Sequence, residues 1–119
     1  MEIIRTYPDT LRKRDIYKFV DSPEIVAVKN AVGTVLTPDA FVIYRDTQTI
    51  SGEEKEVEII AIRDKETGTV FASNSKYLRE EFVKIIDNYL DPDDTEPFLI
   101  ELVEGTSKSG RSYKTCKML

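Results

Sequence analysis

The sequence predicts an all-β protein with added helices, built as a variant OB-fold with a five-stranded, partly open barrel. Two observations lead to this prediction. Three segments rich in β-branched and aromatic residues precede a segment with helical periodicity, and two more such segments follow it. A meander of three strands, a helix between strands 3 and 4, and a closing hairpin is the order of elements in the OB-fold. A β-grasp or another small α+β fold fits this order less well.

The 119 residues form one predicted domain, with a helical N-terminal segment over residues 1–32 and the barrel over residues 33–119. Hydrophobic residues make up 40% of the chain and charged residues 33%, which is enough apolar content for a core. There is no repeat and no linker long enough to separate two domains.

Two short helices are expected in the N-terminal segment. Pro8-Asp9-Thr10 is a typical helix start, and residues 15–20 continue that helix with an apolar face. Ser22-Pro23-Glu24 is a second start, with Ser as N-cap and Pro at the first helical position, and Gly33 ends this helix.

The first three strands follow from β-branched and aromatic runs that are separated by turn residues. They are expected over Thr34–Asp46 with a break at Pro38, over Val57–Asp64, and over Thr69–Ser73. Residues 47–56 are expected to form a loop, and residues 64–68, with the sequence DKETG, a tight hairpin turn.

A helix is expected over residues 74–90, capped by Asn74 or Ser75. Its apolar residues recur at helical spacing and predict core packing: Leu78, Phe82, Ile85, Ile86 and Tyr89. Two further strands over residues 98–104 and 111–118, joined by a turn at 105–110, complete the barrel.

Charge is unevenly distributed along this acidic chain, whose formal net charge is -5. Acidic residues dominate residues 80–104, where Lys84 is the only basic residue, whereas residues 108–119 contain four basic residues and no acid. The net charge argues weakly against a polyanionic partner, but the distribution leaves room for one.

The last strand combines an aromatic residue with cations. Because side chains alternate between the two faces of a strand, Cys116 and Met118 are expected to face the interior, and Arg111, Tyr113 and Lys117 the outside. A tyrosine offers a stacking surface for any base, and neighbouring cations contact the phosphates.

Other residues join this candidate DNA-binding set because the strand 2–3 face and two loops of an OB barrel hold its ligand. Those loops are residues 47–55 and 105–110. For Tyr44 and Phe71, core packing is the alternative interpretation. The full candidate set is Tyr44, Arg45, Arg63, Phe71, Lys108, Arg111, Tyr113 and Lys117.

Several classes of function are disfavoured. The chain has no histidine, which removes histidine-based acid–base chemistry and nearly all zinc sites, so we expect no cofactor, no metal and no enzyme. Residues 105–112 match a phosphate-binding loop except for Arg111 in place of Lys, but too few residues follow for the helix that such a loop needs. The single Cys116, the lack of a signal peptide and the lack of a long apolar run favour a cytoplasmic protein.

Two stretches, TGTVFASNSKYLREEFVKI and PFLIELVEGTSKSGRSYKTCKM, resemble the small single-stranded DNA-binding proteins of phages of Gram-positive bacteria. The sequence is most similar to the lactococcal siphophage type, in the strand end over Gly68–Ser75 and the hairpin over Ser107–Tyr113. The resemblance implies a variant OB-fold that binds single-stranded DNA during phage replication and recombination in the host cytoplasm. It also implies a homo-oligomer, a dimer or tetramer, with phage replication or recombination proteins as further partners.

The alternative function is an acidic protein-interaction module, such as a DNA mimic or inhibitor that docks on a host or phage enzyme. The net charge supports this alternative. Acidic residues scattered over all faces would favour it, whereas their separation from a basic groove would favour DNA binding.

Overall fold

The computed structural model describes all 119 residues. The elements follow in the order β1 (Glu2–Tyr7), α1 (Lys13–Val20), β2 (Val26–Ala27), η1 (the 3-10 helix Val28–Asn30), β3 (Val35–Leu36), β4 (Pro38–Ile50), β5 (Glu53–Asp64), β6 (Val70–Ser73), α2 (Lys76–Tyr89), β7 (Ile100–Thr106) and β8 (Ser112–Met118). The prediction of a mostly β protein with added helices is confirmed. Neither α-helix is long and apolar enough to cross a membrane.

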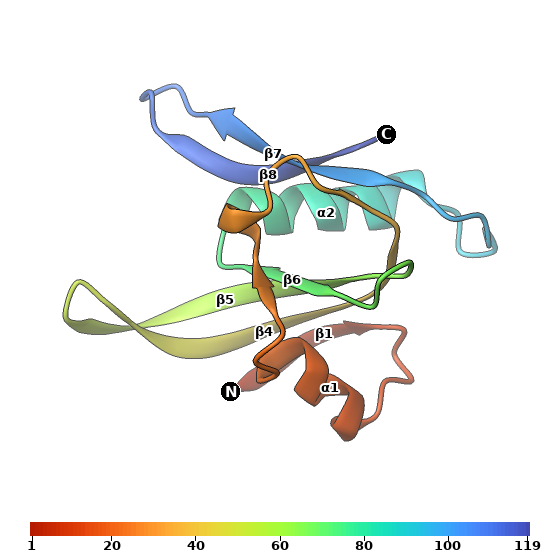
Figure 1. Cartoon of the computed structure of the whole chain (residues 1–119), viewed down its shortest axis with the longest axis horizontal. Coiled ribbons are helices and arrows are strands. Elements are labelled where there is room, and N and C mark those ends of the chain that lie inside the picture. The colour runs from red at the N-terminus through yellow and green to blue at the C-terminus, as the bar shows by residue number, and fades with distance from the viewer.

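The strands form two sheets rather than the single five-stranded barrel that the sequence predicts. One sheet has the order β1-β4-β5-β6-β2, and the other has the order β3-β7-β8. Figure 1 shows α2 lying between them. The division follows from the strand break at Thr37-Pro38, because β3 pairs with β7 whereas β4 pairs with β5.

Asp64 fixes this corner between the sheets. Its carboxylate is 5% exposed and accepts hydrogen bonds from the N–H of Thr37 at 2.9 Å and the hydroxyl of Thr67 at 2.8 Å. Burial by itself raises the pKa of Asp64, but the hydrogen bonds from Thr37, Thr67 and Glu66 outweigh it, so the pKa lies below its ordinary value. Asp64 therefore stays ionised at neutral pH and joins β3–β4 to the turn after β5.

The core has two parts, one on each face of the five-stranded sheet. The larger cluster of 14 buried residues lies between α2 and the two sheets, and includes the edge-to-face pair Phe41 and Phe82, whose ring centroids are 5.2 Å apart. The smaller cluster of seven buried residues packs α1, through Phe19, against the opposite face. Alternation of side chains along β4 and β5 supplies both clusters.

The N-terminal segment is less helical than expected. Residues 2–7 form β1, an edge strand paired with β4, and of the two predicted helices only the first is present, as α1. The predicted helix from Ser22 to Gly33 is wrong. Val26 and Ala27 instead add a parallel strand beside β6, because this places Val28 in the larger core cluster, and the short η1 follows.

The predicted loop over residues 47–56 is also wrong. β4 and β5 stay paired up to Ile50 and Glu53, and the turn is made by Ser51 and Gly52 with φ angles of 54° and 80°. Positive φ at both central residues is the type I′ geometry that suits a two-residue hairpin. The pattern was obscure because these strand ends project beyond the core and have polar residues on both faces.

The rest of the predicted order is confirmed with small shifts. The turn at residues 64–68, the strand after it and the helix after that are present, and Ser75 caps α2 by accepting a hydrogen bond from the N–H of Leu78 at 3.3 Å. β7 begins at Ile100 rather than Phe98. Tyr89 is 67% exposed and does not join the core, because it lies in the last turn of α2.

Candidate nucleic-acid interface

A groove of about 540 Å³ lies between the two long hairpins, β4–β5 and β7–β8. Both hairpins project from the same side of the molecule, at the left of Figure 1. The lining residues come from β4, β5 and β8, from β2 and η1, and from the end of β6 with the two residues after it. They are Ala27, Val28, Lys29, Tyr44, Gln48, Ile59, Ala72, Ser73, Asn74, Ser75, Tyr113 and Lys114. The groove is therefore an open site built from distant parts of the sequence.

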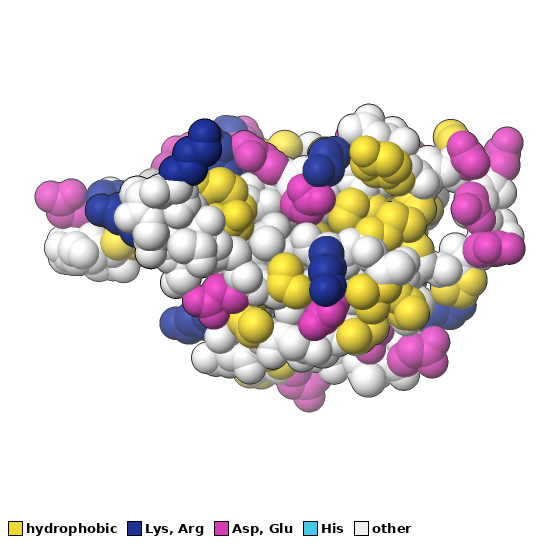
Figure 2. All heavy atoms as spheres, turned by 90° about the horizontal axis from the view of Figure 1, so that it is seen from above, with side chains coloured by type: hydrophobic (Ala, Val, Ile, Leu, Met, Phe, Trp, Pro, Cys, Tyr) yellow, Lys and Arg dark blue, Asp and Glu magenta, His cyan; other side chains and the backbone are white.

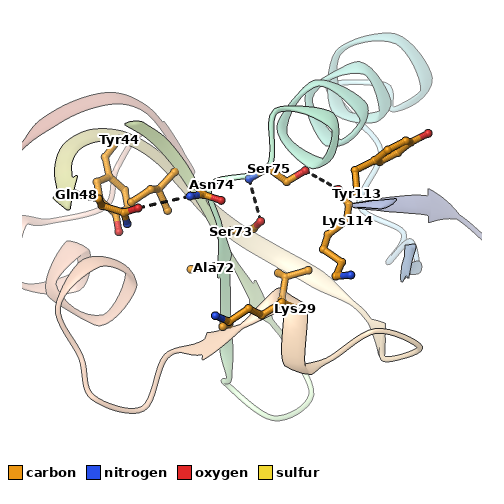
Figure 3. Close-up of a pocket in the computed structure, with 12 residues that line it drawn as sticks. Lys29, Tyr44, Gln48, Ala72, Ser73, Asn74, Ser75, Tyr113 and Lys114 are labelled. Carbon is orange, nitrogen blue, oxygen red and sulfur yellow. Dashed lines mark hydrogen bonds between the residues drawn. The ribbon is translucent and has the colours of Figure 1, made fainter. Parts of the chain in front are cut away.

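The groove lining contains two lysines and no carboxylate. Lys29 makes no ion pair, while Lys114 pairs with Glu104 at 3.2 Å from outside the lining. Figure 3 shows both lysine side chains beside the cavity. The chain as a whole has a net charge of -5, but this groove is locally positive and can attract an anion.

The polar groups of the lining are ordered by hydrogen bonds. Asn74 donates from its side-chain amide to Gln48 at 3.5 Å, and the Ser75 hydroxyl donates to the carbonyl of Lys114 at 2.6 Å (Figure 3). The bond from Ser75 joins the start of α2 to β8, across the end of the groove. Amide side chains of this kind can donate to and accept from the edges of unpaired bases.

The register of the β4–β5 hairpin turns most of its acidic side chains away from the groove. Residues opposite each other in an antiparallel pair share a face, so Lys55 lies on the groove face beside its partner Gln48. Glu54, Glu56 and Glu58 lie on the other face, and Glu53, next to the turn, shares the face of Lys55. On that other face Arg45 pairs with Glu56 at 3.1 Å and with Glu58 at 3.0 Å.

Lys108 and Arg111 lie at the tip of the β7–β8 hairpin, the hairpin that supplies Tyr113 and Lys114 to the groove. Both are exposed and neither makes an ion pair within 4.0 Å. Lys55 lies in the β4–β5 hairpin, so each hairpin has an unpaired cation outside the groove lining. These two predicted residues are thus available to contact phosphates.

Tyr113 is less exposed than the alternation of side chains along its strand predicted. Its ring is half-buried and stacks on Tyr77 of α2, with centroids 4.0 Å apart and planes at 25°. Figure 3 shows the Tyr113 side chain directed away from Lys29, alongside α2. Tyr113 therefore belongs to the groove lining, but its ring is turned toward α2 and is covered on one face by Tyr77.

Arg45, Arg63 and Lys117 are held by carboxylates. Besides its two β5 partners, Arg45 contacts Glu2 at 2.7 Å. These contacts raise the pKa of Arg45, and the hydrogen bond to Glu58 has the largest effect. Lys117 pairs with Glu101 at 3.5 Å.

The guanidinium of Arg63 is also held on two sides. It donates to both carboxylate oxygens of Asp39, at 2.8 and 3.3 Å, and lies 5.6 Å from the centre of the Phe19 ring. Such paired cations are poorly placed to give up a carboxylate for a phosphate.

Phe71 and Tyr44 are core residues, as the alternative interpretation held. Phe71 is 8% exposed within the larger core cluster. Tyr44 is 5% exposed and forms part of the groove floor, and its burial, followed by the charges of Asp46 and Asp21, raises the pKa of its hydroxyl. Neither ring presents a free face for stacking.

The expected alternation along β8 holds at Cys116 and fails at Met118. Cys116 is buried, and this burial raises the pKa of its thiol to about 12, so it is a core residue with little nucleophilic character. Met118 is 42% exposed, because it lies at the last position of an edge strand.

Sequence reasoning missed Lys29, Asn74 and Lys114, and it placed Gln48 and Lys55 in a ligand-binding loop without naming them as contacts. Lys29 and Lys55 fall in the two segments whose structure was predicted wrongly. Lys114 shares the face of Cys116, so alternation placed it toward the interior. One face of β8 belongs to the core at Cys116 and to the groove wall at Lys114. A lysine on the same face as a buried cysteine was the feature of the sequence that could have indicated the groove.

Gly105 is required by the position of Tyr113. The two residues are cross-strand partners, and a Cβ added to Gly105 would lie 2.5 Å from the Tyr113 ring. We expect Gly105→Ala to displace the ring from Tyr77 and to cost about 1–3 kcal/mol of stability through overpacking. Near-UV circular dichroism and urea unfolding measure the two effects.

The control for Gly105 is a double-mutant cycle. In a Tyr113→Ala background the steric conflict is absent, so Gly105→Ala should change stability by less than about 0.5 kcal/mol. An equal cost in both backgrounds would mean that the backbone, and not the ring, demands glycine at this position.

The acidic loop between α2 and β7 lies at the far end of the molecule from the hairpin tips. Its carboxylates belong to residues Asp91, Asp93, Asp94 and Glu96. Acidic side chains gather at the right end in Figure 2, and the loop is at the same end in Figure 1. These four carboxylates are therefore far from the hairpin tips, although the β4–β5 hairpin also contains glutamates, at residues 53, 54, 56 and 58. The structure contains no group of three or more histidine, cysteine, aspartate or glutamate side chains placed to hold a metal ion.

Comparison with known proteins gives one match. The model of a family described as phage single-stranded DNA-binding protein matches residues 8–118, a range that includes both hairpins and all of the groove lining. No curated protein and no solved structure matches the chain. The family is one of DNA-binding proteins rather than enzymes, and the resemblance seen in the sequence is confirmed at this level. The chain belongs to the phage single-stranded DNA-binding protein family.

Proposed function

We propose that this protein binds single-stranded DNA without sequence preference, in the groove between the β4–β5 and β7–β8 hairpins. The observation that supports this site is the charge of the groove: two lysines and no carboxylate line it, in an acidic protein. Unpaired cations on both hairpins extend the same surface.

The phosphates of the strand contact cations of the groove and of its two hairpins. Lys29 lies inside the groove, Lys55 lies on the β4–β5 hairpin, and Lys108 and Arg111 lie on the β7–β8 hairpin. Each such contact releases condensed counterions, so binding weakens as salt increases. Gln48 and Asn74 contact base edges, and because either amide can donate or accept, they tolerate any base.

Bases stack on the exposed ring of Tyr77, next to Tyr113 of the groove lining. Tyr77 is 49% exposed, and Tyr113 supports its ring from behind. An exposed ring that is already ordered loses little conformational freedom when a base stacks on it. The sequence predicted that a base stacks on Tyr113. Here the base stacks on Tyr77 instead, and Tyr113 holds that ring in place.

Single strands are preferred over duplex for a geometric reason. The groove is narrow and has a hairpin on each side, and α2 packs between the two sheets, where it is not free to enter a major groove. We further propose that the two sheets are a variant of the OB-fold. We also propose that the protein acts in phage replication and recombination in the cytoplasm of a Gram-positive host, and that free sheet edges pair copies into a dimer or tetramer.

The lack of carboxylates in the groove lining supports DNA binding over the protein-docking alternative. A DNA mimic needs carboxylates along the surface that replaces DNA, whereas the acidic loop between α2 and β7 lies at the end opposite the hairpin tips. That loop repels DNA from the wrong end and keeps the protein soluble.

The test is fluorescence anisotropy with a labelled oligothymidylate of about 16 nucleotides and a mixed-sequence strand of the same length. A duplex of that length is the matched control. We expect similar affinity for the two single strands, much weaker duplex binding, and a log–log salt slope of about -0.7 for each phosphate contact. Equal affinity for duplex and single strand would contradict the proposal.

A further inference from the structure

The lysines and arginines that make no ion pair fall into two groups. Of the 17 basic residues, eight lie in no ion pair within 4.0 Å. Four of them are the groove cations described above. The other four lie on α1 and in the turn after β5, and are Lys13, Arg14, Lys18 and Lys65. The second group has no part in the groove.

The exposed face of α1 joins three of these cations to an aromatic ring. In an eight-residue helix at 100° per residue, Lys13, Arg14, Tyr17 and Lys18 fall within one arc of about 140°. All four are exposed, with Tyr17 at 55%, while Phe19 on the opposite side is fully buried. The side chains of these four residues make no hydrogen bond or ion pair with the rest of the protein. They contribute nothing visible to the fold.

A second cavity, of about 520 Å³, lies beside this helix face. Tyr17 and Lys18 line one side of it, residues 67–70 at the end of the turn after β5 line another, and residues 22–25 complete it. Glu24 is its only carboxylate. The carboxylate of Asp15, also on α1, is already occupied, because it accepts hydrogen bonds from the backbone N–H and the side chain of Arg12. These contacts, chiefly the one from the backbone N–H, lower the pKa of Asp15.

One chain segment separates this cavity from the groove. Residues 22–25 line the cavity and residues 27–29 line the groove, with only Val26 between them. In Figure 1 this segment runs from α1 to η1 and includes β2, which pairs with β6 at the edge of the five-stranded sheet. A single strand that leaves the groove past Lys29 thus meets α1 next.

We propose that the exposed face of α1 is a second binding surface for the same DNA strand, with Lys13, Arg14 and Lys18 on phosphates and Tyr17 under a base. The inference rests on the proposed function of the groove. A stacked strand advances about 3.4 Å per nucleotide, so about 5 nucleotides span about 17 Å, less than half of the 44 Å length of the molecule. A strand of about 16 nucleotides reaches α1 as well.

The test compares these two lengths of oligothymidylate on the full chain. The variant Lys13→Ala/Arg14→Ala/Lys18→Ala is expected to bind the strand of about 5 nucleotides within about twofold of the parent. It should bind the strand of about 16 nucleotides at least about tenfold more weakly, with a salt slope smaller by about 2, since three contacts of about 0.7 each are lost.

The matched control is Lys76→Ala/Lys84→Ala/Lys117→Ala, which removes the same charge from residues that are already ion-paired. It should bind both lengths like the parent. Tyr17→Ala is a second variant, expected to lose at least about fivefold on the long strand with an unchanged salt slope. Thermal unfolding followed by far-UV circular dichroism verifies that each variant is folded.

Three results would overturn the inference: a triple variant that binds the long strand like the parent, one that weakens both lengths equally, and one whose loss the control reproduces. The first of these is the result expected if α1 instead binds an acidic protein. Failure of the groove proposal is distinct, because replacing Lys29, Lys55 and Lys108 with alanine would then leave the binding of both lengths unchanged.

Discussion

Replacing Lys29, Lys55 and Lys108 together with alanine is expected to weaken the binding of single-stranded DNA by roughly 10²-fold at about 0.1 M salt. The reason is the loss of three phosphate contacts, each of which contributes about 0.7 to the log–log salt slope. The slope should therefore fall by about 2 in the same anisotropy titration. Because all three side chains are free of ion pairs, the variant should keep the stability of the parent within about 0.5 kcal/mol.

The control has the same change in net charge at another place. Lys76, Lys84 and Lys117 are also lysines, but each pairs with a glutamate, on α2 or β7. Their joint replacement should leave the slope nearly unchanged. Should both variants lose affinity to the same degree, the general charge of the protein, and not this groove, would determine binding.

Phe71→Ala is expected to lower the free energy of unfolding by about 3–5 kcal/mol, because it leaves a cavity in the larger core cluster. Phe71→Leu should cost much less and should bind DNA like the parent, since a leucine fills most of the space but offers no aromatic face. Urea unfolding and DNA titration of both variants measure the two properties.

The opposite result would mean that Phe71 contacts DNA and is not needed for the core. That result is a Phe71→Ala variant as stable as the parent, together with a Phe71→Leu variant that folds normally and binds weakly. The comparison therefore also tests the prediction from the sequence that Phe71 is one of the residues on which bases stack.

The parts of the fold that the sequence predicted well are those in which apolar periodicity and turn residues agree. The helix over α2 has five apolar residues in register and a serine cap, and the final hairpin has a glycine-containing turn between two alternating strands. Where the strands carry polar residues on both faces, as at the tip of β4–β5, no such pattern exists. The groove combines such a strand end, at Gln48, with the segment of β2 and η1 whose helix prediction was wrong, and for this reason several of its residues were missed.

The roles of Arg45 and Arg63 were inaccessible to sequence reasoning for a different reason. Both were counted as cations for phosphate because each lies beside a strand or turn of the presumed barrel. Their partners Glu2 and Asp39 are 43 and 24 residues away, and only the pairing of strands brings them together. Net local charge along the sequence is a poor guide where the sheet pairs an arginine with a distant carboxylate.

The position of α2 between the two sheets makes the groove dependent on the interior of the protein. One wall belongs to the five-stranded sheet and the other to the three-stranded sheet, and the chain joins them directly at the Thr37-Pro38 corner and through η1, between β2 and β3. The helix is therefore a spacer, and the volume of its buried side chains, Leu78, Phe82 and Ile85, contributes to the distance between the walls. Larger or smaller residues at these buried positions would widen or narrow the groove without changing any residue of its lining.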